Sequence, residues 1–279
     1  MKISILTDST ADLAASWVAQ YNIRVVPVYV NFGDESFVDD GVALPRSEFY
    51  ARLAHAPELP TTAAPPPGIV EEAYRDLLRD ADHVVTITVA ADLSGVHNSM
   101  ALAANNVAPD KITVLDSGTL SMGLGWQVIA AAEAAHKGAD LAAVLEAARR
   151  ARQKGQVYAA LDTFEFLRKG GRVSWIKAGL GSLLQIKPIV AVKDGKVEPA
   201  GRVRTFKKAF DEMVKLAHTQ VPLERLAVLH SNAPDRAEQL RQALVDIAPA
   251  EDVVIADVTT AIGTHVGPGG IGLAMVTAG

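Results

Sequence analysis

The sequence predicts an α/β protein of two domains, and three observations support this. Strand-like and helix-like segments alternate through residues 1–155, which is typical of a parallel sheet with helices on both faces. Three of these strands run into hydroxyl-bearing turns that open helices. Within residues 156–279 the alternation gives way to a hairpin and mixed elements, which indicates a mixed-sheet α+β domain.

The elements of the first domain follow from local patterns. Runs of apolar and β-branched residues predict strands, and apolar residues spaced three and four apart predict helices. Four prolines between 59 and 68 remove backbone donors and fix φ, so this stretch is predicted as a stiff loop, neither helix nor central strand. The expected strands are 2–7, 23–32, 83–89 and 112–116, and the expected helices are 11–21, 46–55, 68–81, 95–106, 119–136 and 140–154.

The elements of the second domain begin after a boundary placed at Lys154-Gly155. Asp194-Gly195 lies between two apolar runs, which predicts a β-hairpin over 187–204. The other expected strands are 156–161, 225–230, 252–258 and 271–276, and the expected helices are 163–170, 205–219 and 234–247.

The three hydroxyl-bearing turns of the first domain are candidates for an anion site. They are Asp8-Ser9-Thr10, Leu93-Ser94-Gly95 and Asp116-Ser117-Gly118. The carboxyl ends of parallel strands meet at one edge, where helix N-termini offer free N–H groups to anions. Because these residue types are also ordinary helix N-caps, capping is the better explanation of any one turn taken alone.

Composition and charge restrict the class of protein. The 279 residues contain no cysteine, which excludes disulfides and thiolate chemistry and fits a reducing, cytoplasmic location. Neither a signal peptide nor a membrane-inserted segment is expected. A net charge of −5 argues against nucleic-acid binding. Residues 149–208 nevertheless carry +11 and the remainder −16, so the middle of the chain favours an anionic ligand or partner.

Motifs for metal or nucleotide chemistry are absent from the sequence. The seven histidines have no metal-ligand spacing and no phosphate loop occurs, so we expect no metal and no cofactor. Ser94 lacks the flanking glycine of a nucleophile elbow. The glycine-rich stretch 263–272 lacks a Rossmann unit and is expected to be flexible backbone that brings His265 close to a ligand.

Three arginines are candidate anion ligands. Arg172 follows two glycines that end a short helix, and Arg202 and Arg204 lie on one face at the end of the hairpin. Arginine binds carboxylate or phosphate through two hydrogen bonds. A solvated surface charge is the alternative for each of them.

Taken together and in order, these motifs resemble the DegV family of fatty-acid-binding proteins. The similarity spans almost the whole chain. The matching segments are Thr7 to Leu13, Pro60-Thr61-Thr62, Leu93-Ser94-Gly95, Leu115 to Thr119, Leu161-Asp162-Thr163, Lys169 to Ser174, Gln185 to Pro188, Val203-Arg204-Thr205 and His265 to Gly272. Where the family has Thr-Thr-Ser-Gln-Pro-Ser, this chain has Thr61-Thr62-Ala63-Ala64-Pro65-Pro66, and Leu-Ser-Gly-Thr-Tyr becomes Leu93-Ser94-Gly95-Val96-His97.

The resemblance implies a function and a set of site residues. It implies a long-chain fatty acid held with its carboxylate at the domain interface and its tail buried, and presented to a separate fatty-acid kinase that makes an acyl phosphate. It assigns Thr61 or Thr62, Ser94 and the Gly95 N–H to the carboxylate. His265 and Arg172 become head-group or phosphate contacts, with Arg204 and Arg202 nearby.

Two alternatives to a non-catalytic carrier remain open on the sequence. One is an enzyme, either a hydrolase using Ser94 and His265 or a phosphotransferase related to dihydroxyacetone kinases, whose fold the family resembles. A hydrolase needs a carboxylate that orients the histidine, and no sequence feature identifies one. The other is a regulatory protein that senses lipid and binds an acidic partner through the basic stretch 149–208.

Overall fold

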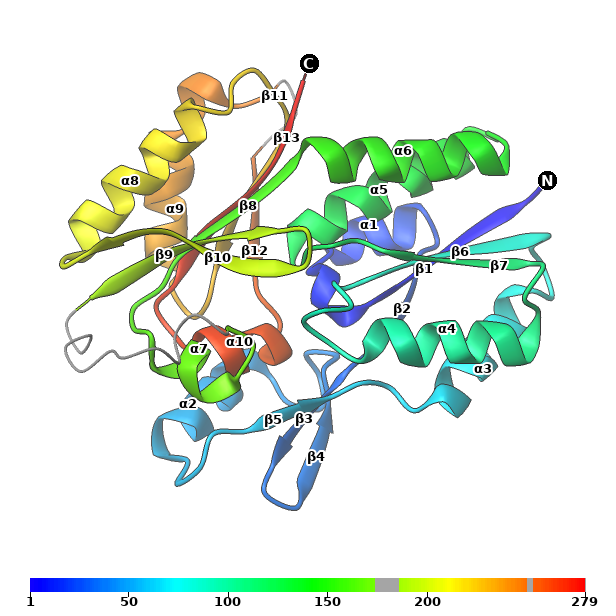
Figure 1. Cartoon of the computed structure of the whole chain (residues 1–279), viewed down its shortest axis with the longest axis horizontal. Helices are drawn as coiled ribbons and strands as arrows, with labels where there is room; N and C mark the ends of the chain where they lie inside the picture. The colour runs from blue at the N-terminus through cyan, green and yellow to red at the C-terminus, as the bar shows by residue number, and fades with distance from the viewer. Residues whose placement is uncertain (174–185, 250–252, 279) are drawn as a thin grey trace.

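The chain forms an α/β structure with a parallel sheet in its N-terminal half and a mixed sheet in its C-terminal half (Figure 1). The structure is a computed structural model, and it describes residues 1–173, 186–249 and 253–278. Ser174 and Gln185, which belong to two of the family-like segments, lie outside the described residues. Among the described residues, no helix combines the length and the apolar character needed to cross a membrane.

The N-terminal sheet is parallel throughout, as the alternation predicts. Its strand order is β2-β1-β6-β7. All six residues of β6 are buried, because helices cover both faces of the sheet. The strands are β1 (Ile3–Asp8), β2 (Arg24–Val26), β6 (His83–Thr88) and β7 (Ile112–Asp116).

A small antiparallel sheet, which the sequence does not predict, stands beside the parallel one. The expected single strand 23–32 is divided between β2 and β3 (Tyr29–Phe32), because Pro27 cannot donate a ladder hydrogen bond. β3 pairs with β4 (Glu35–Val38) on one side and with β5 (Thr61–Ala63) on the other. The prediction of a loop is therefore wrong for Thr61–Ala63, which forms an edge strand, whereas the exclusion of a central strand holds. Pro67 and Gly68 begin the following helix, because proline is tolerated at the first helical position.

The helices of the N-terminal half follow the predicted segments with shifted ends. α1 starts at Ala15, four residues later than predicted, because Ser9–Ala11 forms a 3-10 turn that ends at Asp12 with a φ of 52°. The helices are α1 (Ala15–Gln20), α2 (Arg46–His55), α3 (Pro67–Leu77), α4 (Val96–Val107), α5 (Met122–His136) and α6 (Leu141–Lys154).

The C-terminal sheet has the strand order β10-β9-β8-β13-β11-β12. The predicted hairpin is present as β9 and β10, and its Asp194-Gly195 turn has positive φ at both positions. The strands are β8 (Gly155–Ala160), β9 (Lys187–Lys193), β10 (Lys196–Val203), β11 (Leu223–His230), β12 (Val254–Asp257) and β13 (Ile271–Thr277).

The helices of the C-terminal half contain one clear correction. The stretch predicted to be flexible backbone begins inside a helix, α10 (Thr260–Val266), and His265 lies in its last turn. The expected helix 234–247 ends at Ala243 and continues as a 3-10 turn, Val245–Ile247. The remaining helices are α7 (Glu165–Gly170), α8 (Phe206–His218) and α9 (Pro234–Ala243).

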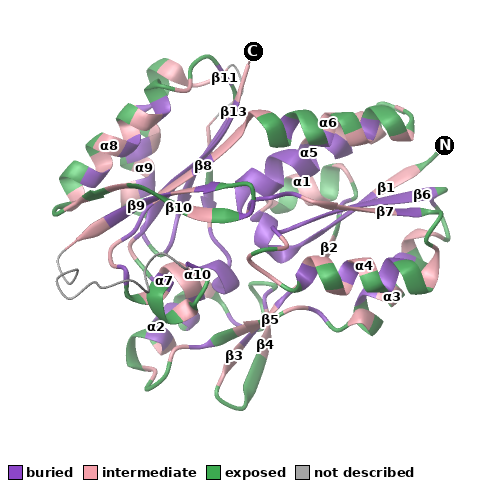
Figure 2. Ribbon diagram, in the orientation of Figure 1, coloured by how far each residue is buried: buried purple, intermediate pink, exposed green. Residues whose placement is uncertain are grey.

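Helix α5 lies between the two larger sheets. It contacts β1 on the N-terminal side and both β8 and β13 on the C-terminal side. The indole Nε1 of Trp126 donates to the carbonyl of Ala274 at 3.0 Å. An all-round apolar helix is expected to be buried, and most of α5 is (Figure 2). A domain boundary at 155, between α6 and β8, stays a prediction, because α5 contributes to both sides.

Candidate functional site

An apolar cavity of about 200 Å³ lies between the two halves of the structure. Residues that pair across neighbouring strands line it from one face of the C-terminal sheet; they are Val190, Ala159, Gly272 and Leu229. The N-terminal half contributes Val28, Val89, Leu93 and Leu120. An apolar ligand suits such a space, because the cavity walls remove its apolar surface from contact with water on every side.

Four predicted polar residues come together in the lining of this cavity: Thr62 from β5, Ser94 from the turn before α4, Arg172 after α7, and His265 from α10. Thr62 Oγ1 and His265 Nε2 are hydrogen-bonded at 3.0 Å, across 203 residues of sequence. Gly95, beside Ser94, also lines the cavity. The cavity therefore has a polar end built from both halves.

His265 is held as a neutral imidazole. Burial, helped by the positive charge of Arg172, lowers the pKa of His265 to about 4. Its Nδ1 is buried and has no hydrogen-bond partner among the described residues. Gly170 covers this atom, and a Cβ at residue 170 would lie 2.7 Å from Nδ1. A neutral ring carries one N–H, so it can donate to an oxygen anion in the appropriate tautomer.

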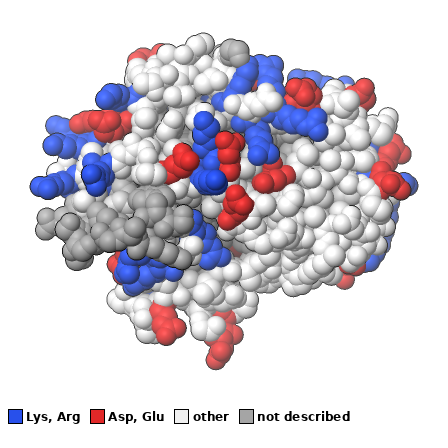
Figure 3. All heavy atoms as spheres, in the orientation of Figure 1, with Lys and Arg blue, Asp and Glu red and all other residues white. Residues whose placement is uncertain are grey.

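Three other predicted residues lie outside this cavity. Thr61 neighbours Thr62 in β5 but points to the opposite face of the strand and is exposed. Arg202 and Arg204 are exposed at the end of β10 and are not in the described lining. Their roles at a head group stay predictions. Figure 3 shows Lys and Arg side chains gathered over the C-terminal sheet and over α6.

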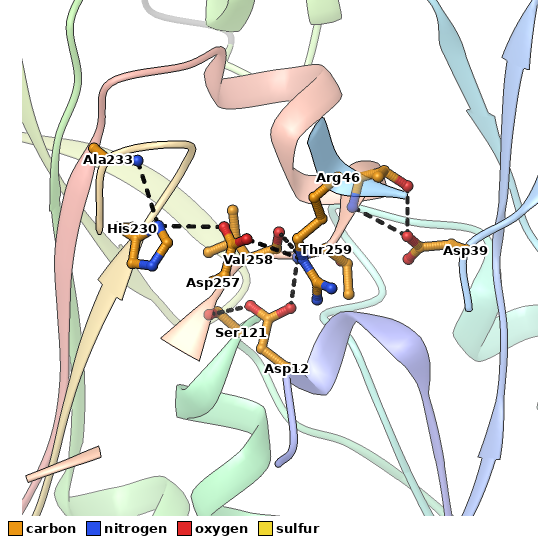
Figure 4. A network of polar contacts seen from close by, with 10 residues as sticks. Asp12, Asp39, Arg46, Ser121, His230, Ala233, Asp257, Val258 and Thr259 are labelled. Atoms are coloured by element: carbon orange, nitrogen blue, oxygen red, sulfur yellow. Dashed lines mark hydrogen bonds and ion pairs between the residues drawn. The ribbon is translucent and has the colours of Figure 1, made fainter. Parts of the chain in front are cut away.

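A network of buried carboxylates, which no local sequence pattern predicts, holds the first turn of α10. Asp39 accepts hydrogen bonds from the backbone N–H of Thr260 at 3.1 Å and from its hydroxyl at 2.6 Å, and also from Ser9. Asp12 accepts from the backbone N–H of Thr259 at 2.8 Å (Figure 4). Because α10 carries His265 in its last turn, these two carboxylates place the histidine. Contacts across more than 200 residues have no local sequence signal.

A second part of the network lies beside the ends of β11 and β12. Asp257 is 3.2 Å from Nδ1 of His230 and 3.5 Å from Nε of Arg46. Arg46 also donates to the carbonyl of Val258 at 3.1 Å (Figure 4). These contacts join α2 of the N-terminal half to the C-terminal sheet. Within the described ranges, no three His, Cys, Asp or Glu side chains are grouped to hold a metal ion.

The buried position of Asp12 predicts a pH-dependent stability. Burial raises the pKa of Asp12 from 3.8 to about 7; nearby Asp39 raises it further, and hydrogen bonds and Arg46 oppose the rise. The folded state therefore holds this proton more tightly than the unfolded chain does. The stabilisation by Asp12 is complete below about pH 4 and is lost as the pH rises through about 7.

The substitution Asp12→Asn tests this, because asparagine cannot ionise. We expect the free energy of unfolding of the unmodified protein to fall relative to that of the variant between about pH 4 and about pH 7 in urea titrations, and to fall no further above that range. Asp8, whose pKa burial also raises, is the same in both proteins, so the difference isolates Asp12. Parallel curves would show that Asp12 is not protonated on folding.

Comparison with known proteins gives one consistent result. The model of the DegV family, described as an uncharacterised protein family, matches residues 2–278. A DegV domain-containing protein of Streptomyces coelicolor is 35% identical over 276 residues, covering 97% of each chain. A fatty-acid-binding DegV family protein of Thermus thermophilus has a TM-score of 0.92 at 34% identity, covering 100% of both chains.

A further solved structure agrees in fold. DegV of Bacillus subtilis, described as a fatty acid binding protein, has a TM-score of 0.88 at 30% identity, with 99% of each chain covered. The two-sheet fold described above is therefore shared with these solved relatives. The chain belongs to the DegV family.

Proposed function

We propose that this protein binds one long-chain fatty acid, with the acyl tail in the interdomain cavity and the carboxylate at Thr62, Ser94 and His265. The observation that carries the proposal is the hydrogen-bonded Thr62–His265 pair in the lining of a mostly apolar cavity. The fatty-acid binding described for the relatives of Thermus thermophilus and Bacillus subtilis supports it.

The energetics of a fatty acid match the two kinds of surface. Each buried methylene contributes about 0.8 kcal/mol, so about fifteen contribute on the order of 12 kcal/mol before the costs of ordering. A buried carboxylate is unstable unless hydrogen bonds compensate its lost hydration. The hydroxyls of Thr62 and Ser94, the Gly95 N–H and an N–H of His265 are donors of the required kind. Arg172 adds positive charge at the exposed rim.

We propose further that the bound acid is presented to a separate kinase. The carboxylate end of the cavity is bordered by exposed residues, Gly95 and Arg172, which a partner enzyme could reach. Presentation is tested by incubating the loaded protein with ATP and a fatty-acid kinase of the same organism. Formation of acyl phosphate supports presentation, and a ligand that stays unphosphorylated counts against it.

A carrier explains the site better than a hydrolase does. The described contacts join His265 Nε2 to Thr62 and leave Nδ1 without a carboxylate to orient it. Ser94 Oγ accepts from the backbone N–H of Val96 at 3.4 Å, as a turn residue does. A nucleophilic serine needs a base within hydrogen-bond reach and a group that orients the base.

The binding proposal is tested first with Thr62→Val, which keeps the shape of the side chain and removes its hydroxyl. Native mass spectrometry of the purified protein should show one fatty acid per chain, and calorimetry with the emptied protein should give its affinity for palmitate. We expect about tenfold weaker binding in the variant, because the carboxylate loses a donor and His265 loses its partner.

Thr61→Val is the matched control for this experiment. It makes the same chemical change one residue away, on the exposed face of β5. Palmitate affinity should not change. An unmodified protein that carries no lipid and takes up no palmitate or oleate would overturn the proposal, and equal losses in both variants would remove Thr62 from the site.

A further inference from the structure

One buried residue on the cavity wall has an unusual backbone conformation. Ser121 has φ 53° and ψ −147°, is 0% exposed and lines the cavity. This region of φ and ψ is occupied almost only by glycine, because a Cβ is strained there. The other described non-glycine residues with positive φ are all Asp or Asn, which tolerate it better. A serine that is held in this conformation needs a compensating contact.

The contact is a hydrogen bond to the carboxylate network. The hydroxyl of Ser121 donates to Oδ2 of Asp12 at 2.5 Å, and Oδ1 of the same carboxylate accepts from the Thr259 N–H at 2.8 Å. Figure 4 shows Asp12 between these two partners. Asp12 is itself 7% exposed and has a left-handed backbone, with φ 52°. Two residues with positive φ thus meet where the wall of the cavity touches the start of α10.

The far end of α10 is the head-group site. The helix spans only Thr260–Val266, so a shift of its first turn moves His265 in its last. Thr62, the partner of His265, lies on β5 in the N-terminal half. The 3.0 Å bond between them therefore depends on how α10 is fixed to that half. Asp39 fixes it at Thr260, and Asp12 fixes it one residue earlier.

We propose that Ser121 is a positioning residue for the head-group site: by holding Asp12 against Thr259 it fixes α10 and thereby aligns His265 with Thr62 for the carboxylate. The inference rests on the proposed function and goes beyond it, because Ser121 lies on the wall of the tail cavity. Without the Ser121 contact, Asp39 remains the second anchor, so α10 can pivot while the fold persists. The same contact joins the space for the tail to the site for the head group.

Ser121→Gly tests this. Glycine adopts the backbone of residue 121 without strain, and this gain offsets the lost hydrogen bond, so thermal stability should change little. The affinity for palmitate should nevertheless fall about tenfold. In the ligand-free protein, an NMR titration should show the pKa of His265 rising from about 4 toward 6.5, because a pivoting α10 admits water to the ring. Arg172 is the charged group that acts on this histidine, and it is unchanged.

Two further variants separate positioning from general loosening. Ser117→Ala removes a buried hydroxyl from the same loop, where it bonds only to Thr119, and should leave the His265 titration unchanged. The single variant Asp12→Asn should keep most of the unmodified behaviour, because its amide can accept from the Thr259 N–H and donate to the Ser121 hydroxyl.

The proposal is overturned if Ser121→Gly leaves the His265 titration where it was, or if Ser117→Ala shifts it equally. Because the titration needs no ligand, it is decided independently of fatty-acid binding. If the unmodified protein fails to bind palmitate, the proposed function is contradicted. If the unmodified protein binds palmitate but the pKa of His265 is unchanged in Ser121→Gly, only the positioning role is contradicted.

Discussion

Replacing Gly267 with alanine is expected to lower the free energy of unfolding by about 3 kcal/mol, from backbone strain and overpacking together. Gly267 ends α10 with a φ of 71°, which an alanine adopts only under strain. A Cβ at this position would also overlap the ring of Phe166 on α7. Because α7 and α10 also meet at Gly170 and His265, the variant should bind palmitate more weakly.

Gly138→Ala provides the matched control, measured with it by urea unfolding. Gly138 has a similar φ of 78°, but a Cβ there would have no heavy atom of the described residues within 4 Å, apart from those of its two chain neighbours. It should lose only the strain contribution, about 1 kcal/mol. Equal losses in the two variants would show that the contact with Phe166 does not decide the cost.

Filling the cavity should abolish ligand binding without unfolding the protein. Ala159 lies in the middle of the strand row that lines the cavity, between Val190 and Gly272. In Ala159→Phe the ring occupies the space proposed for the tail, and it buries its own apolar surface there. We expect native mass spectrometry to show no bound lipid and calorimetry to show no uptake of palmitate, with circular dichroism unchanged.

Ala191→Phe is the control for the added bulk. Ala191 lies on β9 between Val190 and Val192, so its side chain points to the opposite face of the sheet. Lipid should be retained in this variant. If Ala159→Phe still copurified with a full complement of fatty acid, the tail would have to lie elsewhere, and the interdomain cavity would lose its assignment.

An element can be predicted from the sequence when the residues that determine it lie within the element itself. The parallel strands and most helices have their own periodicity, so their positions were predicted within a few residues. The sequence predicts β2 and β3 as one strand, because Pro27 lies within a mainly apolar run that looks continuous from its composition. Local propensity does not predict α10, because four of its seven residues are Thr, Gly or Val, which favour helix only weakly. Its first turn is held instead by Asp12 and Asp39, far away in the chain.

The candidate site shows the same division. Turn chemistry singled out Ser94, and a glycine-rich context singled out His265, but nothing local relates either residue to Thr62. Resemblance to a family placed the three together, and the structure adds the 3.0 Å contact between Thr62 and His265. The sequence does not mark Ser121 as unusual, because its strain lies in its backbone φ and ψ, which the identity of the residue does not reveal.

Because α5 lies between the two sheets, neither sheet can be separated from the other without exposing this helix. A helix that is buried against β1 on one side and β13 on the other belongs to neither half alone. Cutting the chain near residue 155 would strip Trp126 of its carbonyl partner, Ala274, and expose an apolar helix face to water. We therefore expect the two sheets to unfold together as one cooperative unit.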